Sequence, residues 1–291
     1  MSLLEAYYYD GSRKCKMDEL PTNSKKDKVK KEEILEKFQK NLILLDELQN
    51  TFYSYKKEGM ILVLQAMDAG GKDSLIRHVA SSMNPQGVHV SCLKRPSEEE
   101  LSHDYLWRIH QSIPRRGEIT IFNRSYYEDI VTAEVHHLMK TYPMADRVIG
   151  GKEASFIKKR IKQVKNYEGY LYENSYRVVK VFLHVSKDKQ KERLLERLDI
   201  PEKNWKFEAG DLEERQIFDV YMKKYENTIT ETASKECPWY VLPADQKWYT
   251  RYLLTEILID QFKKVGAKYP SLSKEEEGML DVYRERLMKE E

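Results

Sequence analysis

Hydrophobic and polar positions alternate along this chain with two different periods. Short apolar runs that suit strands fall at residues 61–64, 88–93, 118–122, 178–185 and 239–242. Between these runs, apolar residues recur every three or four positions, which is typical of helices that bury one face. Strands that alternate with helices predict an α/β fold, in which helices cover both faces of a central parallel sheet.

The same pattern places the helices and divides the chain into three parts. We expect helices at residues 29–57, 74–83, 97–112, 126–138, 152–172, 187–198, 212–233 and 247–264. Residues 1–28 are polar and rich in lysine, which predicts an N-terminal arm or a partly disordered segment. We assign residues 29–268 to one domain and expect a charged helical tail at residues 269–291.

Composition narrows the class of protein. The chain has 291 residues, of which 41% are hydrophobic and 34% are charged, and its formal net charge is +2. No apolar stretch approaches the roughly 18–20 residues that cross a bilayer, and the N-terminus lacks a signal-peptide pattern. We therefore expect a cytoplasmic protein with no membrane partner. The near-neutral total charge argues against nucleic acid as a partner, because extended nucleic-acid binding needs many phosphate contacts.

The three cysteines give no sign of a structural cross-link. Cys15, Cys92 and Cys237 are widely spaced and form no C-x-x-C pair. This spacing predicts plain thiols rather than a disulfide framework or a zinc site.

The strand at residues 61–64 leads into the sequence Q-A-M-D-A-G-G-K-D-S at residues 65–74. Phosphate-binding loops have the pattern G-x-x-x-x-G-K-[ST], in which backbone N–H groups and the lysine bind phosphates at a helix N-terminus. Here Ala66 replaces the first glycine and Asp73 replaces the hydroxyl residue, while Asp68 lies inside the loop. The alternative is an ordinary tight turn between a strand and a helix, with glycines that allow close packing.

A second polar motif, I-F-N-R-S-Y-Y-E-D at residues 121–129, follows the third predicted strand. In parallel sheets, ligands bind beyond the carboxyl ends of the strands, so Asn123, Arg124 and Glu128 are candidates for the same site. The alternative is a capped helix start, in which Ser125 is the N-cap and Glu128 completes a capping box.

A third, basic segment is E-R-L-L-E-R-L-D-I-P-E-K-N-W-K-F at residues 192–207. Arg193 and Arg197 are four residues apart and share one helix face, which suits a mobile lid that closes over phosphates. The alternative is a solvated helix in which Glu192 and Glu196 pair with these arginines. Together, the three motifs favour phosphoryl transfer, since that chemistry depends on positioning and charge neutralisation.

These motifs resemble those of the family-2 polyphosphate kinases, and the resemblance extends from about residue 29 to residue 264. It also includes N-P-Q-G-V, K-R-P-S-E-E-E-L-S-H-D-Y-L-W-R, P-E-K-N-W-K-F and P-W-Y-V-L-P-A-D-Q-K-W-Y. The resemblance implies a three-layer α/β/α P-loop kinase fold, similar to that of thymidylate kinase, with a helical lid at about residues 193–215. The implied reaction is reversible, Mg²⁺-dependent phosphoryl transfer between inorganic polyphosphate and AMP or ADP, giving ADP or ATP.

The resemblance also assigns roles to residues. It implies catalytic roles for Asp68, Lys72, Arg124, Arg193 and Arg197, with Asp68 as the ligand of Mg²⁺, or of Mn²⁺ in its place. It implies phosphate or polyphosphate contacts for Ala69, Gly70, Gly71, Lys72, Asp73, Ser74, Lys203 and Lys206. It implies nucleotide contacts for Lys94, Arg95, Arg108, Asn123, Arg124 and Glu128, and a homo-oligomer, either a dimer or a tetramer.

Two of three departures from the family pattern point to one branch. Many members carry Asp where Asn123 stands and Asn where Glu128 stands, and this exchange resembles the branch that accepts AMP as well as ADP. Glu128 is then placed to contact the adenine amino group. Ile200 stands before Pro201 where an acid is expected, so we assign no ligand role there.

Two rival functions remain open from the sequence. One is an ATP-dependent nucleoside monophosphate kinase, which has little use for Asp73 in place of the hydroxyl residue. The other is a non-catalytic module that binds phosphate or nucleic acid and retains the loop as a scaffold.

Overall fold

The computed structural model describes residues 3–290, and within them six strands form one sheet in the order β1-β6-β5-β2-β4-β3. The strands are β1 Tyr8–Tyr9, β2 Gly59–Ala66, β3 Val88–Cys92, β4 Ile119–Asn123, β5 Tyr176–His184 and β6 Trp239–Pro243. Strands β2 to β6 are parallel, as the sequence predicts. The expectation of a wholly parallel sheet is wrong at one edge, because β1 pairs with β6 in the antiparallel direction.

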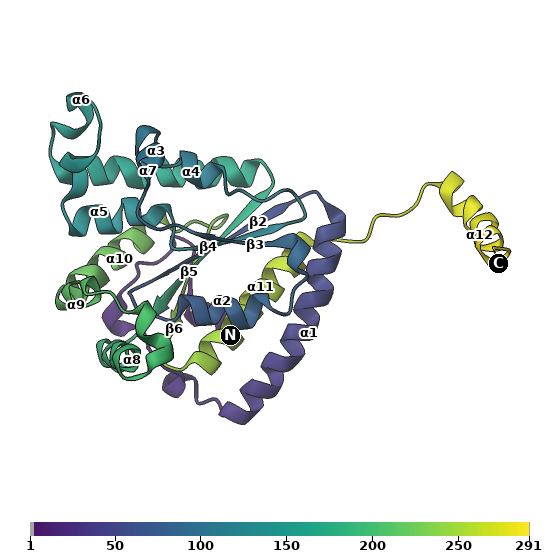
Figure 1. Cartoon of the computed structure of the whole chain (residues 1–291), viewed down its shortest axis with the longest axis horizontal. Coiled ribbons are helices and arrows are strands. Elements are labelled where there is room, and N and C mark those ends of the chain that lie inside the picture. Colours follow the sequence, from purple (N-terminus) through teal and green to yellow (C-terminus); the bar gives the residue numbers. More distant parts are fainter. Residues whose placement is uncertain (1–2, 291) are drawn as a thin grey trace.

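Helices cover both faces of the sheet (Figure 1). One layer contains α1 (Lys31–Tyr55), α2 (Lys72–Ala80) and α11 (Lys247–Val265), with α11 packed against both others. The opposite layer contains α5 (Val131–Val135), α7 (Glu153–Glu173) and α10 (Phe218–Thr232), with α10 packed against α5 and α7. The remaining α-helices are α3 Glu98–Ser102, α4 Trp107–His110, α6 Asp146–Ile149, α8 Lys187–Asp199, α9 Gly210–Gln216 and α12 Lys274–Met288. Short 3₁₀ helices are η1 Leu3–Ala6, η2 Met17–Glu19, η3 Ser24–Asp27, η4 Pro85–Gly87, η5 Tyr126–Asp129, η6 Leu138–Thr141 and η7 Pro201–Lys206.

The centre of the sheet is apolar with one buried ion pair. Every residue of β2 is buried, as expected for a strand covered on both faces. Lys180 of β5 is also fully buried, where its Nζ contacts Glu168 of α7 at 2.6 Å and donates to the Thr232 carbonyl at 2.9 Å. The hydroxyls of Tyr126 and Tyr127 both donate to the same Glu168 carboxylate at 2.8 Å. Both members of this buried charge pair therefore have further hydrogen-bond partners, which such pairs require.

Three helices that the periodicity predicts as continuous are broken. The helix expected at residues 97–112 begins with a capping box at Ser97, but separates into α3 and α4, where the Asp104 carboxylate accepts from the Leu106 amide at 3.0 Å. Such local side-chain bonds compete with the helical ladder. The helix expected at residues 126–138 becomes η5, α5 and η6. The helix expected at residues 212–233 separates into α9 and α10, and Arg215 ties α9 to the Lys187 carbonyl of α8 at 2.6 Å.

The N-terminal arm is ordered, so the expectation of a partly disordered segment is wrong for residues 3–28. Beyond the pairing of β1 with β6, Tyr7, Cys15 and Met17 are buried in the core. The hydroxyls of Tyr7 and Tyr249 both donate to the Asp27 carboxylate. The apolar residues of the arm are few but large, and the periodicity of a short strand is too weak to reveal them.

The C-terminal helix α12 lies apart from the body of the molecule, at the end of an extended segment (Figure 1). All of its residues are exposed. Within the described residues, no helix is both long and apolar enough to span a membrane. The three cysteines are free, as predicted, with Cys15 and Cys237 buried and Cys92 exposed.

Candidate functional site

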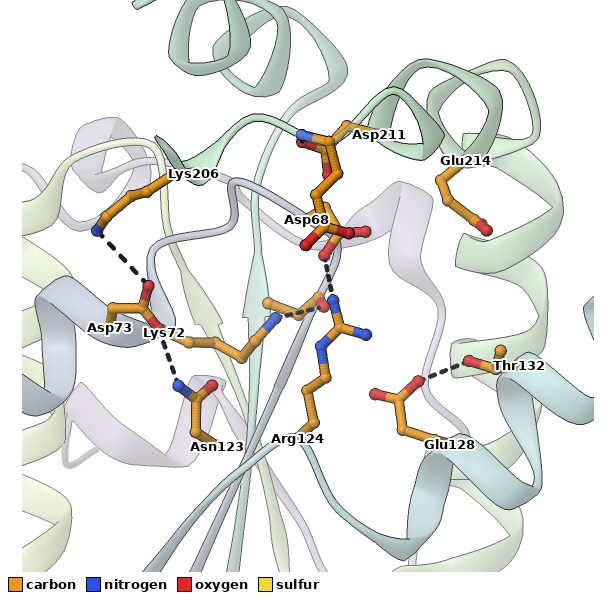
Figure 2. Close-up of polar contacts among 12 residues, drawn as sticks. Asp68, Lys72, Asp73, Asn123, Arg124, Glu128, Thr132, Lys206, Asp211 and Glu214 are labelled. Atoms are coloured by element: carbon orange, nitrogen blue, oxygen red, sulfur yellow. Dashed lines mark hydrogen bonds and ion pairs between the residues drawn. The ribbon is translucent and has the colours of Figure 1, made fainter. Parts of the chain in front are cut away.

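The candidate site lies at the carboxyl ends of the parallel strands, where the loops after β2, β4, β5 and β6 meet. The loop after β2 provides Asp68, Lys72 and Asp73, and the turn after β4 provides Asn123 and Arg124 (Figure 2). Because β2 and β4 are neighbours in the sheet, with Leu64 opposite Asn123, residues distant in the sequence come together here. The predicted convergence of the first two motifs is therefore present.

The loop after β2 has the backbone geometry of an anion-binding turn. Ala69 has a left-handed conformation with φ of 57°, and Gly71, the N-cap of α2, has φ of 107°. A Cβ on Gly70 would lie 2.6 Å from the Cβ of Ala66 and 2.7 Å from the carbonyl oxygen of Met67, so no larger residue fits. Ala66 is the last residue of β2 and has extended backbone, which explains why glycine is not needed there.

Lys72 is the first residue of α2 and is buried against the loop. Its Nζ donates to the Ala66 carbonyl at 2.9 Å. Burial lowers the pKa of this ammonium group, and the nearby carboxylate of Asp68 opposes the shift. A lysine held in this way presents a poorly hydrated cation to any anion that binds at the N-terminus of α2.

Asp68 and Arg124 form an ion pair at the centre of the site (Figure 2). Arg124 Nη2 donates to Asp68 Oδ1 at 2.6 Å, and the two side chains are 44% and 26% exposed. Arg124 has a left-handed backbone with φ of 66°, and its amide donates to the Leu64 carbonyl at 3.2 Å. This conformation turns the chain sharply after β4. Both charged groups are therefore accessible to a ligand and close enough to act on it together.

Asp73, which replaces the usual hydroxyl residue, links three elements. Its Oδ1 accepts from Asn123 Nδ2 at 2.8 Å, and its Oδ2 lies 3.7 Å from Lys206 Nζ (Figure 2). An acidic side chain in the first turn of a helix is favoured by the helix dipole. The carboxylate thus connects α2 to the end of β4 and to η7 in the lid.

Glu128 is held by two side chains rather than by a capping box. Its Oε2 accepts from Thr132 Oγ1 at 2.6 Å. In the amide orientation that matches donors with acceptors, Gln65 Nε2 donates to Glu128 Oε1 at 3.1 Å. Ser125 does cap η5, by accepting from the Tyr127 amide at 3.2 Å, but Glu128 does not return to the Ser125 amide. The capping-box alternative is therefore wrong, and the Glu128 carboxylate faces the site.

Arg193 is hydrogen-bonded to the loop after β2 and does not extend freely from the predicted lid. It is buried and donates to the carbonyl groups of Ala69, Gly70, Ala244 and Asp245 at 3.1, 2.9, 2.6 and 3.3 Å. A single guanidinium therefore joins α8 to the loop after β2 and to the loop after β6.

The other predicted lid cations pair with acids within or beside the lid. Arg197 Nη1 donates to Asp211 Oδ2 at 2.8 Å, and Lys203 Nζ contacts Glu196 Oε2 at 2.8 Å. Glu192 pairs with Lys189. The alternative of solvated pairs between the two arginines and Glu192 or Glu196 is therefore wrong.

Three predicted nucleotide-binding residues lie in the segment between β3 and β4. Lys94 and Arg95 are exposed in the loop after β3. Arg108 is buried and donates to the Lys94 carbonyl at 2.8 Å, with Glu100 3.6 Å away. Arg108 therefore holds this loop in place.

Comparison with known proteins identifies the family. A family model described as Polyphosphate kinase 2 (PPK2) matches residues 25–270. The chain belongs to the polyphosphate kinase 2 family. The predicted family and the P-loop kinase-like α/β fold are thus confirmed. Membership in a kinase family favours an enzyme over a non-catalytic binding module.

Relatives of this family match over most of the chain. The ADP-polyphosphate phosphotransferase of Rhodopseudomonas palustris is 43% identical over 246 residues, which cover 84% of this chain and 84% of that protein. The AMP/ADP-polyphosphate phosphotransferase of Meiothermus ruber is 43% identical over 226 residues, which cover 78% of this chain and 80% of that protein. The crystal structure of polyphosphate kinase 2 from Arthrobacter aurescens has a TM-score of 0.75 at 35% identity, and the match covers 84% of each chain.

Several residues at this family site were missed by sequence reasoning. Gln190 Nε2 donates to the Asp68 carbonyl at 3.1 Å, and Asp211 lies beside Asp68 (Figure 2). Gln65 is a polar residue in an apolar strand, and Thr132 is four residues after Glu128. Both could therefore have been identified from the sequence as candidate site residues. Asp211 carried no such signal, because it lies in a charged helix, α9, that has no motif of its own.

The carboxylates at this site fit a magnesium ion. Magnesium usually takes one or two protein carboxylates and completes its shell with water and substrate phosphates. Asp68 and Asp211 are neighbours, and the pKa of Asp211 is raised by burial and by the Asp68 charge, so a cation between them would relieve their repulsion. Within residues 3–290, no group of three His, Cys, Asp or Glu side chains could hold an ion. A bound ion would therefore also need oxygens from water or substrate.

Proposed function

We propose that this enzyme transfers a phosphoryl group reversibly between inorganic polyphosphate and AMP or ADP, giving ADP or ATP. The proposal is supported by the names of the two relatives that are each 43% identical to this chain. The structural observation that carries it is the convergence of Lys72, Asp68 and Arg124 at the N-terminus of α2. This group can bind phosphates on both sides of a transferring phosphoryl group.

In the proposed arrangement, each side of the site holds one substrate. Polyphosphate binds the backbone amides of residues 69–73 together with Lys72, where the helix dipole and a buried cation favour an anion. Arg124 binds the phosphate of the accepting nucleotide, since a guanidinium can hold two phosphate oxygens. The acceptor oxygen then attacks in line, and no phosphoenzyme is formed.

Magnesium is the proposed cofactor, with Mn²⁺ as a substitute. Asp68 would hold it, and Asp211, whose pKa is raised by burial and by the charge of Asp68, would add a second carboxylate. When bound, the ion supplies charge neutralisation to the phosphate oxygens. Arg124, which pairs with Asp68 in this structure, can then turn to the nucleotide phosphate.

AMP is proposed as an acceptor in addition to ADP. Glu128 lies beside Arg124 at the acceptor side, with its carboxylate fixed by Thr132 and Gln65 (Figure 2). A carboxylate at the acceptor side can accept a hydrogen bond from an adenine amino group. Asn123 donates to Asp73, so its side chain helps to position the loop helix.

The proposal is tested by assaying AMP, ADP, GMP and GDP with polyphosphate and Mg²⁺, in both directions. We expect ADP and ATP to form from AMP, with adenine nucleotides preferred. If no nucleotide is phosphorylated by polyphosphate while ATP phosphorylates AMP, the protein is instead an ATP-dependent nucleoside monophosphate kinase.

Replacement of Asp68 is the most direct single-residue test of the proposed function. We expect Asp68→Asn to lower kcat by at least about 10³-fold, because the amide cannot neutralise a metal or balance Arg124. The unfolding temperature should change little, since the side chain is partly exposed. Asp46→Asn on α1, which removes an exposed carboxylate far from the site, is the matched control. Unchanged turnover in Asp68→Asn would contradict the assigned role.

We also propose a cytoplasmic homo-oligomer, either a dimer or a tetramer. Sedimentation velocity of the purified chain measures its oligomeric state directly. A monomer at micromolar concentration would contradict it.

A further inference from the structure

The short helix α9 carries Asp211 into the site but buries no other side chain. Asp211 is the one buried residue of this helix, and the neighbouring Leu212 is 50% exposed. A helix of about two turns with so little apolar contact is positioned by its polar contacts rather than by packing. The partners of these contacts therefore determine where Asp211 lies.

Two of the contacts that hold α9 lead back to α8. Asp211 Oδ2 accepts from Arg197 Nη1 at 2.8 Å. Arg215 donates to the Lys187 carbonyl at 2.6 Å and to Gln190 Oε1 at 3.0 Å. Neither contact joins α9 to the helical layer of α5, α7 and α10.

A third contact, between Glu214 and His136, joins α9 to that layer. Glu214 Oε1 lies 2.8 Å from Nε2 of His136, the C-cap residue of α5. The Tyr221 hydroxyl of α10 lies 3.1 Å from the same Nε2 atom. Burial and a hydrogen bond to Glu214 raise the pKa of Tyr221. One carboxylate of α9 is therefore held by residues from two helices of this layer.

Glu214 depends on this contact because its other oxygen has no partner. Within residues 3–290, Glu214 Oε2 is buried and accepts no hydrogen bond. A partly buried carboxylate that also loses the partner of its first oxygen is destabilised until it reaches water. Removal of the His136 donor therefore favours movement of Glu214, and of α9 with it, away from α5.

Such a movement would displace Asp211. Asp211 and Glu214 are three positions apart on α9, so they lie on the same side of the helix, and both extend from it toward the body of the molecule (Figure 2). Burial and the charge of Asp68 raise the pKa of Asp211, which means that the two carboxylates repel each other. An additional contact that holds α9 opposes this repulsion.

We propose that His136 and Tyr221 are positioning residues for the metal site. They hold Glu214, and Glu214 keeps α9 in the orientation that places Asp211 beside Asp68. The inference rests on the proposed function, in which these two aspartates hold Mg²⁺. It gives the end of α5 a role in assembling the metal site without any contact to substrate.

Two variants that conserve side-chain shape test the inference, and titration calorimetry of the free protein with Mg²⁺ measures their effect. His136→Phe removes the nitrogen but keeps a ring, and Tyr221→Phe removes only the hydroxyl. We expect each to raise the dissociation constant of Mg²⁺ by about 5–10-fold, as for the loss of one hydrogen bond to a charged group. Hydrogen exchange at residues 210–216 should become at least about 5-fold faster, while exchange at residues 218–232 stays unchanged.

Two further variants serve as controls. His136→Gln keeps an N–H donor near the position of Nε2 and should retain the Mg²⁺ affinity of the wild type. His89→Phe is the matched control, because it removes a histidine–glutamate contact of 3.0 Å, to Glu118, at the β3 edge of the sheet. Its Mg²⁺ affinity should also equal that of the wild type.

An unchanged Mg²⁺ affinity in both phenylalanine variants of the cluster would overturn the inference, even if exchange in α9 became faster. Equal weakening in His136→Gln, or faster exchange throughout the protein, would also overturn it by indicating general destabilisation. If the wild type bound no Mg²⁺, the two-carboxylate site itself would be contradicted. Turnover of AMP with polyphosphate by the wild type is assayed separately and decides on the proposed function alone.

Discussion

At the scale of single residues, four cations of the site are paired with acids of the same chain. The pairs are Arg124 with Asp68, Arg197 with Asp211, Lys203 with Glu196, and Lys206 with Asp73. Phosphate groups that bind these cations must therefore displace carboxylates. The affinity for a polyanion is consequently smaller than the count of cations suggests, because each contact replaces an existing one.

Thr132 is expected to act as a positioning residue for Glu128. Thr132→Val keeps the side-chain shape but removes the 2.6 Å hydrogen bond to Glu128 Oε2. If Glu128 binds the adenine amino group, we expect the KM for AMP to rise by about 5–10-fold with little change in kcat. Steady-state kinetics with AMP measure both parameters.

Thr132→Ser provides the control, because it restores the hydroxyl and should restore the KM. A lower unfolding temperature with an unchanged KM would mean that Thr132 only stabilises α5.

Asp129 should make the stability of the protein depend on pH. Burial raises the pKa of this carboxyl to about 6 from its ordinary 3.8, although Arg160 and Arg108 oppose the shift. Between these two values the folded state binds more protons than the unfolded state, so stability falls as the pH rises from about 4 to about 6. Asp129→Asn cannot titrate. Its stability relative to the wild type should rise by about 2–3 kcal/mol between pH 4 and pH 7.

Urea unfolding of both proteins at several pH values measures this difference. A constant difference across the range would show that Asp129 titrates at its ordinary pKa in the folded protein.

At the scale of elements, the sequence indicated the site well and the lid less well. The motif at residues 65–74 predicted the positions of the loop and of the start of α2, because glycines and a lysine at this spacing are typical of phosphate-binding loops. The spacing of Arg193 and Arg197 correctly placed both on α8. Their partners were not predictable, since Ala244 and Asp211 approach α8 only in the folded chain.

The link from α8 to the loop predicts the effect of replacing Arg193. Arg193→Lys keeps the charge, but a lysine ammonium group cannot hydrogen-bond to the four carbonyl oxygens, which belong to two different loops. We expect the free energy of unfolding to fall by about 2–4 kcal/mol, together with a loss of kcat. Urea unfolding and turnover are measured in parallel, with Arg284→Lys on α12 as the exposed control.

Full stability with strongly reduced kcat would contradict the bracing role of Arg193. It would instead indicate that the guanidinium contacts the substrate.

Other elements show where periodicity fails. Long helices such as α1, α7 and α11 were predicted to within a few residues, because each presents many apolar positions. The helices expected at residues 97–112, 126–138 and 212–233 are each divided into shorter elements. The Asp104 and Arg215 bonds at two of these breaks are invisible in a hydrophobic pattern.

At the scale of the whole molecule, the sheet and its two helical layers followed from the alternation of strands and helices. The two ends of the chain behave differently. The N-terminal arm is built into the body through β1 and Asp27, whereas α12 stands apart with all its residues exposed (Figure 1).

Removal of the tail should therefore leave the body intact. For the chain truncated after residue 268, we expect an unfolding temperature within about 1–2 °C of the wild type and an unchanged kcat, because α12 buries no residue. Calorimetry and turnover measure these quantities. A clear loss of thermal stability would indicate that α12 packs against another copy of the chain.

The pairing of β1 with β6 has a consequence for how the chain reaches its native state. Tyr8 pairs with Tyr240, so β1 cannot pair until β6, which comes much later in the sequence, has been synthesised. Until then, the β6 edge has no partner, and an unpaired strand edge can recruit another chain. A protein that begins at residue 29 would keep that edge open permanently. We expect such a truncation to aggregate during refolding even though every residue of the phosphate-binding loop is retained.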